Sequence, residues 1–123
     1  MPELEKHLPL TPAVFHILMA LSDGEKHGYA IMRIVKETTN GSMVLGPGTL
    51  YGAIKRLQTA DLIVESDYRP DPVIDDARRR YYKLTDLGRL VLIAESERLA
   101  ALVDYARRKD LLGAEGARHG GEA

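Results

Sequence analysis

The sequence predicts a mainly helical domain that carries one small β-hairpin and ends in a long helix. Three stretches with helical periodicity come first, and each is bounded by capping or turn residues. Two short stretches rich in β-branched and aromatic residues then flank a polar segment with two prolines. A final stretch of helical character runs from residue 85 to about residue 112. The order is therefore helix, helix, helix, strand, strand and long helix.

The first two helices have clear start and stop signals. Thr11 and Pro12 fit the N-cap and the first helical position of the first helix, and Asp23 with Gly24 ends it. The second helix opens near residues 27–28 and ends near residues 40–41, an Asn-Gly pair that tolerates a left-handed backbone. The apolar positions at helical spacing are Val14, Phe15, Ile17, Leu18 and Leu21 in the first helix and Ile31, Ile34 and Val35 in the second.

The third helix begins at residues 46–49 (GPGT) and stops at Ala60 and Asp61. Its apolar residues lie at positions i, i+4 and i+7, which place them on one inward stripe. The opposite face is polar. The inward residues are Leu50, Ile54 and Leu57, and the other face carries Tyr51, Gly52, Lys55 and Gln58.

Two strands are predicted after the third helix, at residues 62–66 (LIVES) and 80–84 (RYYKL). The segment between them is polar and carries Pro70 and Pro72. It is too long for a tight turn, so we expect a hairpin with an extended tip, here called the wing. Three short helices followed by a basic hairpin are the layout of a winged helix-turn-helix.

The fourth helix is capped by Thr85 and Asp86 and is long for a domain of this size. Residues 90–94 (LVLIA) are apolar in succession and encircle the helix, so it needs both its own domain and a partner to cover it. We expect residues 1–84 to form the winged domain, 85–112 a dimerisation helix and 113–123 a disordered tail. Leu87, Leu90, Val91 and Ala94 are expected to face inward, and Leu92, Leu99, Leu102, Val103 and Ala106 to face a second copy of the chain.

The composition excludes several classes of function. The 123 residues include no cysteine, which rules out disulfides, thiolate metal sites and a cysteine nucleophile. No serine lies in a nucleophile-elbow context, and no histidine pair has the spacing of a metal site. We therefore expect no enzymatic activity, no cofactor and no metal. No apolar run reaches the length of a membrane span and no signal peptide is evident, so a cytoplasmic location is expected.

The net charge of −1 hides an uneven distribution. Residues 26–60 carry a net charge of +4, and residues 78–83 carry another +4. Acidic residues dominate the rest of the chain. Two basic islands make a local positive face, which is what contact with phosphate groups needs. The alternative is scattered solvated charge.

Four motifs in register resemble the PadR-type transcriptional regulators. The resemblance covers residues 10 to about 105. It implies a winged-helix repressor that dimerises through its C-terminal helix, in the short subfamily without a separate effector domain. Regulators of this type often respond to small aromatic or drug-like compounds. The motifs are residues 10–18 (LTPAVFHIL), 27–31 (HGYAI), 46–57 (GPGTLYGAIKRL) and 79–85 (RRYYKLT), followed by Gly88.

In a helix-turn-helix the third helix lies in the major groove and its N-terminal turns meet the bases. The start of the second helix contacts the sugar-phosphate backbone in such folds, and the hairpin reaches the minor groove or nearby phosphates. The candidate DNA contacts are His27 and Tyr29 on the second helix; Gly48, Thr49, Tyr51, Gly52, Lys55 and Arg56 on the third; and Arg78, Arg79 and Arg80 at the hairpin.

Each group of candidates has a structural alternative. Tyr51 packs into the core in that alternative, while His27 caps its helix and Tyr29 turns inward. Glycines 46 and 48 then serve only the geometry of a helix start. The wing arginines pair with Asp71, Asp75 and Asp76 of the same loop, as surface interactions of about 0–1 kcal/mol.

The predicted function is a homodimeric repressor on a palindromic operator, with two recognition helices one DNA turn apart, roughly 34 Å. A small effector would bind between the C-terminal helices, which only the resemblance implies. The alternative is a winged-helix module that binds proteins and reads no bases. Such a module would keep its partner when Lys55 and Arg80 are reversed in charge.

Overall fold

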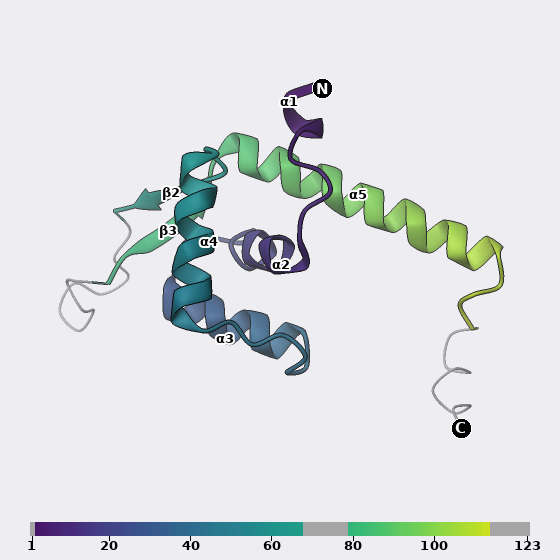
Figure 1. The fold of residues 1–123 in the computed structure, drawn as a ribbon, viewed down its shortest axis with the longest axis horizontal. Helices are drawn as coiled ribbons and strands as arrows, with labels where there is room; N and C mark the ends of the chain where they lie inside the picture. The colour runs from purple at the N-terminus through teal and green to yellow at the C-terminus, as the bar shows by residue number, and fades with distance from the viewer. Residues whose placement is uncertain (1, 68–78, 114–123) are drawn as a thin grey trace.

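The computed structural model describes residues 2–67 and 79–113. The expected mainly helical fold with a small β-sheet is confirmed (Figure 1). The first predicted helix is α2 (Pro12–Ala20), the second is α3 (Gly28–Thr38) and the third is α4 (Pro47–Thr59). The predicted strands are β2 (Ile63–Ser66) and β3 (Tyr81–Leu84), and the last helix is α5 (Asp86–Arg108). The tip of the predicted wing and all of the predicted disordered tail except Gly113 lie outside the described residues.

Two short elements were not predicted. The chain opens with α1 (Pro2–Glu5), a single turn that packs against α5. Strand β1 (Lys26–His27) has two residues and pairs with β3, so the sheet has the antiparallel order β1-β3-β2. Neither element is long enough to show a periodic pattern. Both depend on contacts with distant parts of the chain, which local sequence does not display.

The helix caps follow the sequence signals. The side chain of Thr11 accepts a hydrogen bond from the amide of Val14 at the start of α2, and Thr85 does the same for Gly88 in α5. Helices α3 and α4 each end in a residue with a left-handed backbone, Asn40 at φ 52° and Asp61 at φ 64°. Asparagine and aspartate adopt this conformation more readily than other residues with side chains, so each ends its helix.

Helix α5 ends four residues earlier than predicted, at Arg108 rather than near Leu112. Asp110 has φ 63°, and the amide of Leu111 donates to the carbonyl of Ala106 at 2.9 Å. This is the hydrogen-bond pattern of a helix terminus closed by a left-handed residue. An aspartate therefore stops the helix before Gly113, the stop signal that the sequence suggested.

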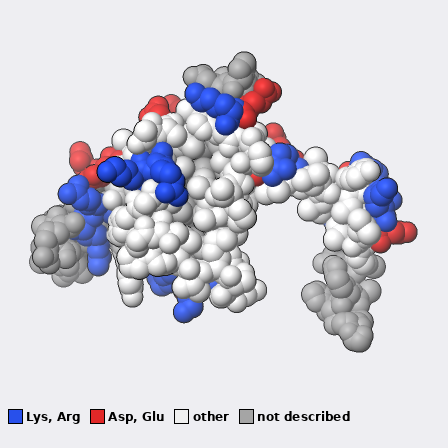
Figure 2. Space-filling view, viewed as in Figure 1, with Lys and Arg blue, Asp and Glu red and all other residues white. Residues whose placement is uncertain are grey.

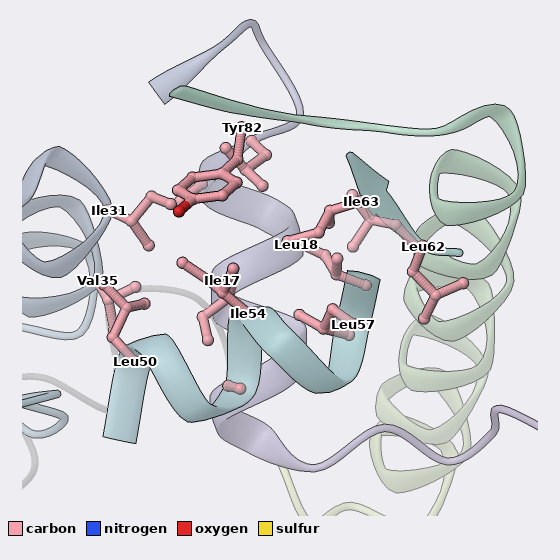
Figure 3. Close-up of a cluster of buried hydrophobic side chains, with 14 of the residues drawn as sticks. Ile17, Leu18, Ile31, Val35, Leu50, Ile54, Leu57, Leu62, Ile63 and Tyr82 are labelled. Atoms are coloured by element: carbon pink, nitrogen blue, oxygen red, sulfur yellow. The ribbon is translucent and has the colours of Figure 1, made fainter. Parts of the chain in front are cut away.

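The core lies between α2, α3, α4, the sheet and the first half of α5 (Figure 3). The predicted inward residues of α3 and α4 occupy it. Five core side chains are completely buried: Ile17, Leu18, Ile31, Val35 and Leu50. Full burial of an aliphatic side chain of this size stabilises the folded state by about 1.5–3 kcal/mol. This shared packing fixes the angle between α3 and α4. The two helices that position the candidate site are therefore held by one shared core.

The buried face of α5 is rotated from the predicted one. Gly88, Val91, Leu92 and Glu95 are its buried residues. A Cβ at position 88 would lie 1.9 Å from the carbonyl oxygen of Leu62, so α5 crosses the chain at Gly88 in direct contact with backbone. Because α5 contacts the chain at Gly88, the residues on the same side in the next two helical turns, Val91, Leu92 and Glu95, face the core.

Two expectations about α5 are corrected by this rotation. Leu92 was expected to face a partner, but it is 5% exposed and belongs to the core of its own domain. Leu90 was expected to face inward, but it is 46% exposed. An apolar run that encircles a helix does not reveal its orientation, and the contact at Gly88 sets it. Leu87 packs against the core and Val91 lies within it, as expected, and Ala94 is half-buried.

Candidate nucleic-acid interface

The predicted recognition residues share the outer face of α4. The side chains of Thr49, Tyr51, Lys55 and Arg56 are exposed, and Leu50, Ile54 and Leu57 on the other side of the helix are buried. The apolar stripe therefore holds α4 against the domain while its other face meets the surroundings. This arrangement is the one that the helical spacing predicted.

The glycines of this face are not required by the fold. At Gly46 and Gly48 an added Cβ would meet nothing within 4 Å, and neither residue has a positive φ. At Gly52 the nearest atom is a guanidinium nitrogen of Arg56 at 3.6 Å, an ordinary contact. The alternative that residues 46 and 48 serve only the geometry of the helix start has no support in packing or backbone conformation. What glycine provides here is a surface without side chains, which lets another molecule approach the backbone closely.

His27 and Tyr29 at the start of α3 were each given two interpretations, DNA contact or a structural role, and the structure treats the two residues differently. His27 is the N-cap of α3, and its Nδ1 accepts a hydrogen bond of 3.1 Å from the amide of Ala30. The ring also contacts Tyr81 edge-to-face at 5.3 Å between centroids. His27 is thus the helix cap of the structural alternative. Tyr29 is 71% exposed and points outward, which contradicts the inward alternative for this residue.

Tyr51 connects α4 to the start of α3. An added Cβ at Gly28 would lie 2.2 Å from the Tyr51 hydroxyl oxygen and 2.7 Å from the adjacent ring carbon. Gly28 is buried, and Tyr51 remains 46% exposed. One edge of the Tyr51 ring therefore packs on α3, and the rest of the ring faces outward. The side chain is neither fully in the core nor free of it.

The base of the hairpin contributes two of the three predicted arginines. Arg79 and Arg80 are exposed, and Arg78 lies outside the described residues, as do Asp71, Asp75 and Asp76. Arg80 makes two hydrogen bonds of 3.2 Å to the carboxylate oxygens of Glu65 on the neighbouring strand. Figure 2 shows Lys and Arg side chains gathered at the hairpin end of the molecule.

A groove of about 710 Å³ lies between the start of α3, α4 and the base of the hairpin. It brings together five of the predicted DNA contacts and two residues that sequence reasoning missed, Gly28 and Tyr82. The remaining candidates on α4 lie outside its lining. The groove is lined by His27, Gly28, Tyr29, Tyr51, Arg79, Arg80 and Tyr82.

Tyr82 is a buried member of this groove, with 4% exposure. Burial raises the pKa of its hydroxyl above the ordinary value, and the nearby Tyr51 and Glu65 add to this effect. The hydroxyl is therefore a hydrogen-bond donor at neutral pH. Two features of the sequence could have indicated these missed residues. Gly28 directly follows a capping residue, and Tyr82 breaks the alternation expected of a half-exposed strand.

A second basic surface borders the outer side of α3. A hollow of about 240 Å³ is lined there by Tyr29, Met32, Arg33, Lys36, Val44 and Leu45. Arg33 lies 3.6 Å from Glu37 in an exposed ion pair. Arg33 and Lys36 were counted in the first basic island but not among the candidate contacts. They extend the cationic surface from the groove along α3.

The second half of α5 carries the candidate dimer residues beyond the rest of the domain (Figure 1). Leu102 is 52% exposed and Val103 is 47% exposed, while Leu99 and Ala106 are half-buried. The opposite side of this stretch presents Glu97, Asp104 and Arg108. Four of the five residues predicted for a partner therefore share an apolar face of this stretch, whereas Leu92 lies earlier on the same side of α5, where the core of its own domain covers it.

Residues 2–67 and 79–113 contain neither a metal-binding cluster nor a membrane-spanning helix. No group of three or more histidine, aspartate or glutamate side chains there has the geometry to hold a metal ion. No helix in the same ranges is both long and apolar enough to cross a membrane.

Comparison with known proteins gives a family match over most of the chain. The model of the "Transcriptional regulator PadR-like family" matches residues 17–94. The transcriptional regulator Rv3488 of Mycobacterium tuberculosis is 34% identical over 87 residues, which are 71% of this chain and 75% of that protein. An uncharacterized 37.1 kDa protein in transposon TN4556 of Streptomyces fradiae is 37% identical over 86 residues. Those residues are 70% of this chain but only 22% of that protein, so the chain spans about a fifth of its length.

Solved structures with the same fold include transcriptional regulators. One from Clostridium thermocellum has a TM-score of 0.62 at 25% identity, covering 78% of this chain and 87% of that one. Bacillus subtilis PadR in complex with operator DNA has a TM-score of 0.56 at 25% identity, covering 66% of this chain and 44% of that one. The winged-helix architecture is thus shared with regulators of transcription.

Proposed function

Because the chain belongs to the PadR-like family of transcriptional regulators, we propose that it is a homodimeric repressor that binds double-stranded DNA through α4. The observation that carries this proposal is the outer face of α4. Thr49, Tyr51, Lys55 and Arg56 project from it, and the glycines at 48 and 52 are required by neither packing nor backbone conformation. A helix that enters the major groove needs this combination of polar side chains and close backbone approach.

The other candidate contacts support the same orientation. Tyr29 and Arg79 border the groove beside α4, so phosphates that flank the major groove would meet them when α4 is inserted. The complex of a relative, Bacillus subtilis PadR, with operator DNA is consistent with this use of the fold. Contacts from Arg78 belong to the proposal, although that residue lies outside the described part of the chain.

The proposed dimer uses the apolar face of α5. Leu99, Leu102, Val103 and Ala106 supply this face, and a second copy related by a twofold axis would cover it with the same residues. Such a dimer presents two copies of α4 to successive turns of DNA, roughly 34 Å apart, and so binds a palindromic operator. The division into a winged domain and a dimerisation helix is part of this proposal, with the first half of α5 assigned to the winged domain.

Relief of repression by a small aromatic or drug-like effector is also proposed, from the family resemblance. The site would lie between the two C-terminal helices, which approach each other only in the dimer. An effector acts by binding one arrangement of the two winged domains more tightly than another. Its effect is therefore measured as a change in operator affinity at a fixed amount of dimer.

Charge reversal on α4 tests the proposal. Lys55→Glu should weaken binding to operator DNA by about 1–3 kcal/mol, which is roughly tenfold to a hundredfold. The matched control is Lys109→Glu, which reverses an exposed lysine just after α5. Fluorescence anisotropy with labelled DNA from upstream of the gene measures both. Equal affinity for the two variants would contradict the proposal and favour a module that binds a protein partner instead.

A further inference from the structure

Helix α5 packs against α2 and is hydrogen-bonded to the chain at both ends of that helix. Near the start of α5, Nη2 of Arg89 donates to the carbonyl of Ser22, which follows α2, at 3.1 Å. Further along α5, the carboxylate of Glu95 accepts a hydrogen bond of 3.2 Å from the amide of Leu10, which precedes α2. Both bonds join residues that are far apart in the sequence. They therefore help to set how α5 lies across the domain.

The bond at Glu95 is better protected from water than the bond at Arg89. Glu95 is 1% exposed, whereas Arg89 is exposed. Arg98, one turn further along α5, donates two hydrogen bonds of 2.7 and 2.8 Å to the same carboxylate. A bidentate pair of this kind restricts the orientation of the carboxylate. The Leu10 amide thus meets an acceptor whose position is fixed by α5 itself.

The segment before α2 is also held in place. Helix α1 packs against α5, and Leu4, Leu8 and Leu10 pack against the core. The chain passes α5 on its way from α1 to α2 (Figure 1). The hydrogen bond from Leu10 to Glu95 therefore connects two parts of the molecule that are each anchored, and it limits the movement of one against the other.

Glu95 is the last buried residue of α5. Residues 96–108 include no buried side chain, and this half of the helix projects beyond the rest of the domain (Figure 1). It is roughly 20 Å long at a rise of about 1.5 Å per residue. A tilt of about 10° at Glu95 would move its far end by roughly 3.5 Å, which is close to the rise of one base pair in DNA.

The proposed dimer face begins directly after Glu95 on the same side of α5. At about 100° per residue, Leu102 and Ala106 lie within about 20° of Glu95 around the helix, and Leu99 lies within about 40°. A second copy that covers this face would meet α5 where the contact of α5 with its own domain ends. In a twofold dimer, the tilt at Glu95 then determines from both sides how far apart the two α4 helices lie.

We propose that Glu95 is a positioning residue, which fixes the tilt of α5 on its domain and thereby the spacing of the two DNA half-sites that the dimer binds. The inference rests on the proposed homodimer and its binding to operator DNA. Glu95 acts through α5 and leaves the contacts of each α4 unchanged. A change at Glu95 should therefore alter the preference among operators of different spacing and leave the affinity for a single half-site unchanged.

The tilt of α5 is measured as the distance between two spin labels in one chain. Because the sequence has no cysteine, Gln58→Cys and Arg107→Cys attach labels only at two exposed positions, on α4 and near the end of α5. An excess of unlabelled chain ensures that each measured pair lies within one chain. In Glu95→Leu the distance should shift, or its distribution widen, by about 3 Å.

The matched control is Glu97→Leu, the same substitution at an exposed position on the opposite side of α5. It should give the distance distribution of the parent chain. Identical distributions in the parent chain, Glu95→Leu and Glu97→Leu would overturn the inference.

Glu95→Leu should fold, because the new side chain is apolar and the Arg98 side chain, 39% exposed, can be hydrated once it is released. Circular dichroism and the unfolding temperature check this expectation. If Glu95→Leu does not fold, Glu95→Gln takes its place, with Glu97→Gln as the control. Glu95→Gln removes the charge that Arg98 binds, so a change in the same direction but of smaller size is expected. Identical distributions in this second pair would likewise overturn the inference.

Operators of altered spacing test the consequence for DNA binding. One inserted base pair moves the second half-site by about 3.4 Å and turns it by about 35° around the DNA axis. The parent chain should lose about tenfold in affinity for each inserted base pair, similar to the cost of a mismatched one. If Glu95→Leu halves this cost in free energy, its loss becomes about threefold. Both chains should bind a single half-site equally well.

The two measurements separate this inference from the proposed function. If the parent chain binds its upstream DNA, and Glu95→Leu changes neither the label distance nor the spacing preference, the inference is wrong and the proposed function stands. If the label distance changes but the parent chain is monomeric or binds no DNA, the proposed function is wrong, and with it the role of Glu95 in operator spacing.

Discussion

At the scale of single residues, the glycines divide into two kinds. At Gly88 an added Cβ would lie 1.9 Å from the backbone oxygen of Leu62, and at Gly28 it would overlap the Tyr51 hydroxyl. At Gly48 it would meet nothing within 4 Å. The first two are explained by packing inside this chain. Nothing within the described chain requires a glycine at position 48, which fits the proposed close approach of DNA.

A substitution at Gly48 therefore has opposite effects on stability and binding. Gly48→Ala should raise the free energy of unfolding by roughly 0.5–1 kcal/mol, because alanine loses less backbone freedom on folding. The same change should weaken operator binding, since the added methyl group holds the backbone away from DNA. Urea unfolding and fluorescence anisotropy measure the two effects.

Gly88→Ala is the control for this prediction. It should lower stability by about 1–3 kcal/mol through overpacking against Leu62. Unchanged DNA affinity in Gly48→Ala, at higher stability, would mean that Gly48 faces no ligand.

Glu95 is the buried charged residue among the described core, with 1% exposure. Its carboxylate accepts hydrogen bonds from Arg98 at 2.7 and 2.8 Å and from the amide of Leu10 at 3.2 Å. These bonds tie α5 to the segment before α2. The hydrogen bonds from Arg98 lower the pKa of Glu95 below its ordinary value of 4.5, and that from Leu10 adds to the effect.

The lowered pKa predicts how stability changes with pH. A carboxylate whose pKa is depressed by folding stabilises the fold above its ordinary pKa, and this contribution is lost as the pH falls through the folded pKa. Glu95→Gln should therefore cost about 1–3 kcal/mol at neutral pH, and the difference from the parent chain should shrink below pH 4.5. Urea unfolding at a series of pH values measures this difference. A difference that stays constant between neutral pH and pH 3 would contradict the role given to the carboxylate.

At the scale of elements, the sequence was informative where a helix or strand carries its own signals. Thr11, Thr85 and Asn40 marked helix ends because caps and left-handed residues act locally. The ladder from Ile63 to Ser66 with β3 was predicted in place because its residues favour strands. Strand β1 has two residues and exists only through its pairing with Tyr81 and Tyr82, so no local pattern could reveal it.

The candidate site was likewise predictable from the sequence only where a single element carries its own signal. The outer face of α4 follows from the helical spacing of its apolar residues, because these mark the side that packs on the core and the polar residues must then face outward. The groove does not follow from periodicity, because Gly28, Tyr51 and Tyr82 come from three separate elements. The orientation of α5 was likewise hidden, since the contact between Gly88 and the Leu62 carbonyl is made across the fold. Leu92 was misplaced for this reason.

Helix α5 provides the prediction for the dimer. Leu102→Asp should convert the proposed dimer to monomers, because a charge on a covered apolar face would be desolvated without a partner. Leu102 is 52% exposed in the single chain, so the substitution should not disturb the fold of the monomer. Leu99→Asp, on the same face, should act in the same direction. Light scattering coupled to size-exclusion chromatography measures the mass.

Ala101→Asp is the control on α5. Ala101 is exposed and lies about 160° around the helix from Leu99 at 100° per residue, on the side of Glu97 and Asp104. This variant should remain a dimer. A monomeric parent chain, or a dimer that survives both leucine substitutions, would show that the assigned face is not the interface.

At the scale of the whole molecule, the net charge is small, but the basic and acidic residues are concentrated in different parts of the chain. The net charge is −1, yet the groove and the hairpin base are lined with cationic side chains and donors. This separation favours contact with nucleic acid at the face that carries the groove, although the end of α5 also exposes Arg107, Arg108 and Lys109. Orientation on DNA would be set by that face, and sequence preference by the polar residues of α4.

Whether this chain reads DNA sequence through α4 is decided by a comparative titration. The intact chain is titrated with DNA from upstream of its own gene and with random DNA of equal length, across a series of salt concentrations. We expect binding to the upstream DNA to be at least about a thousandfold tighter than to random DNA, with affinity that falls steeply as salt rises. Equal affinity for the two DNAs, insensitive to salt, would contradict it.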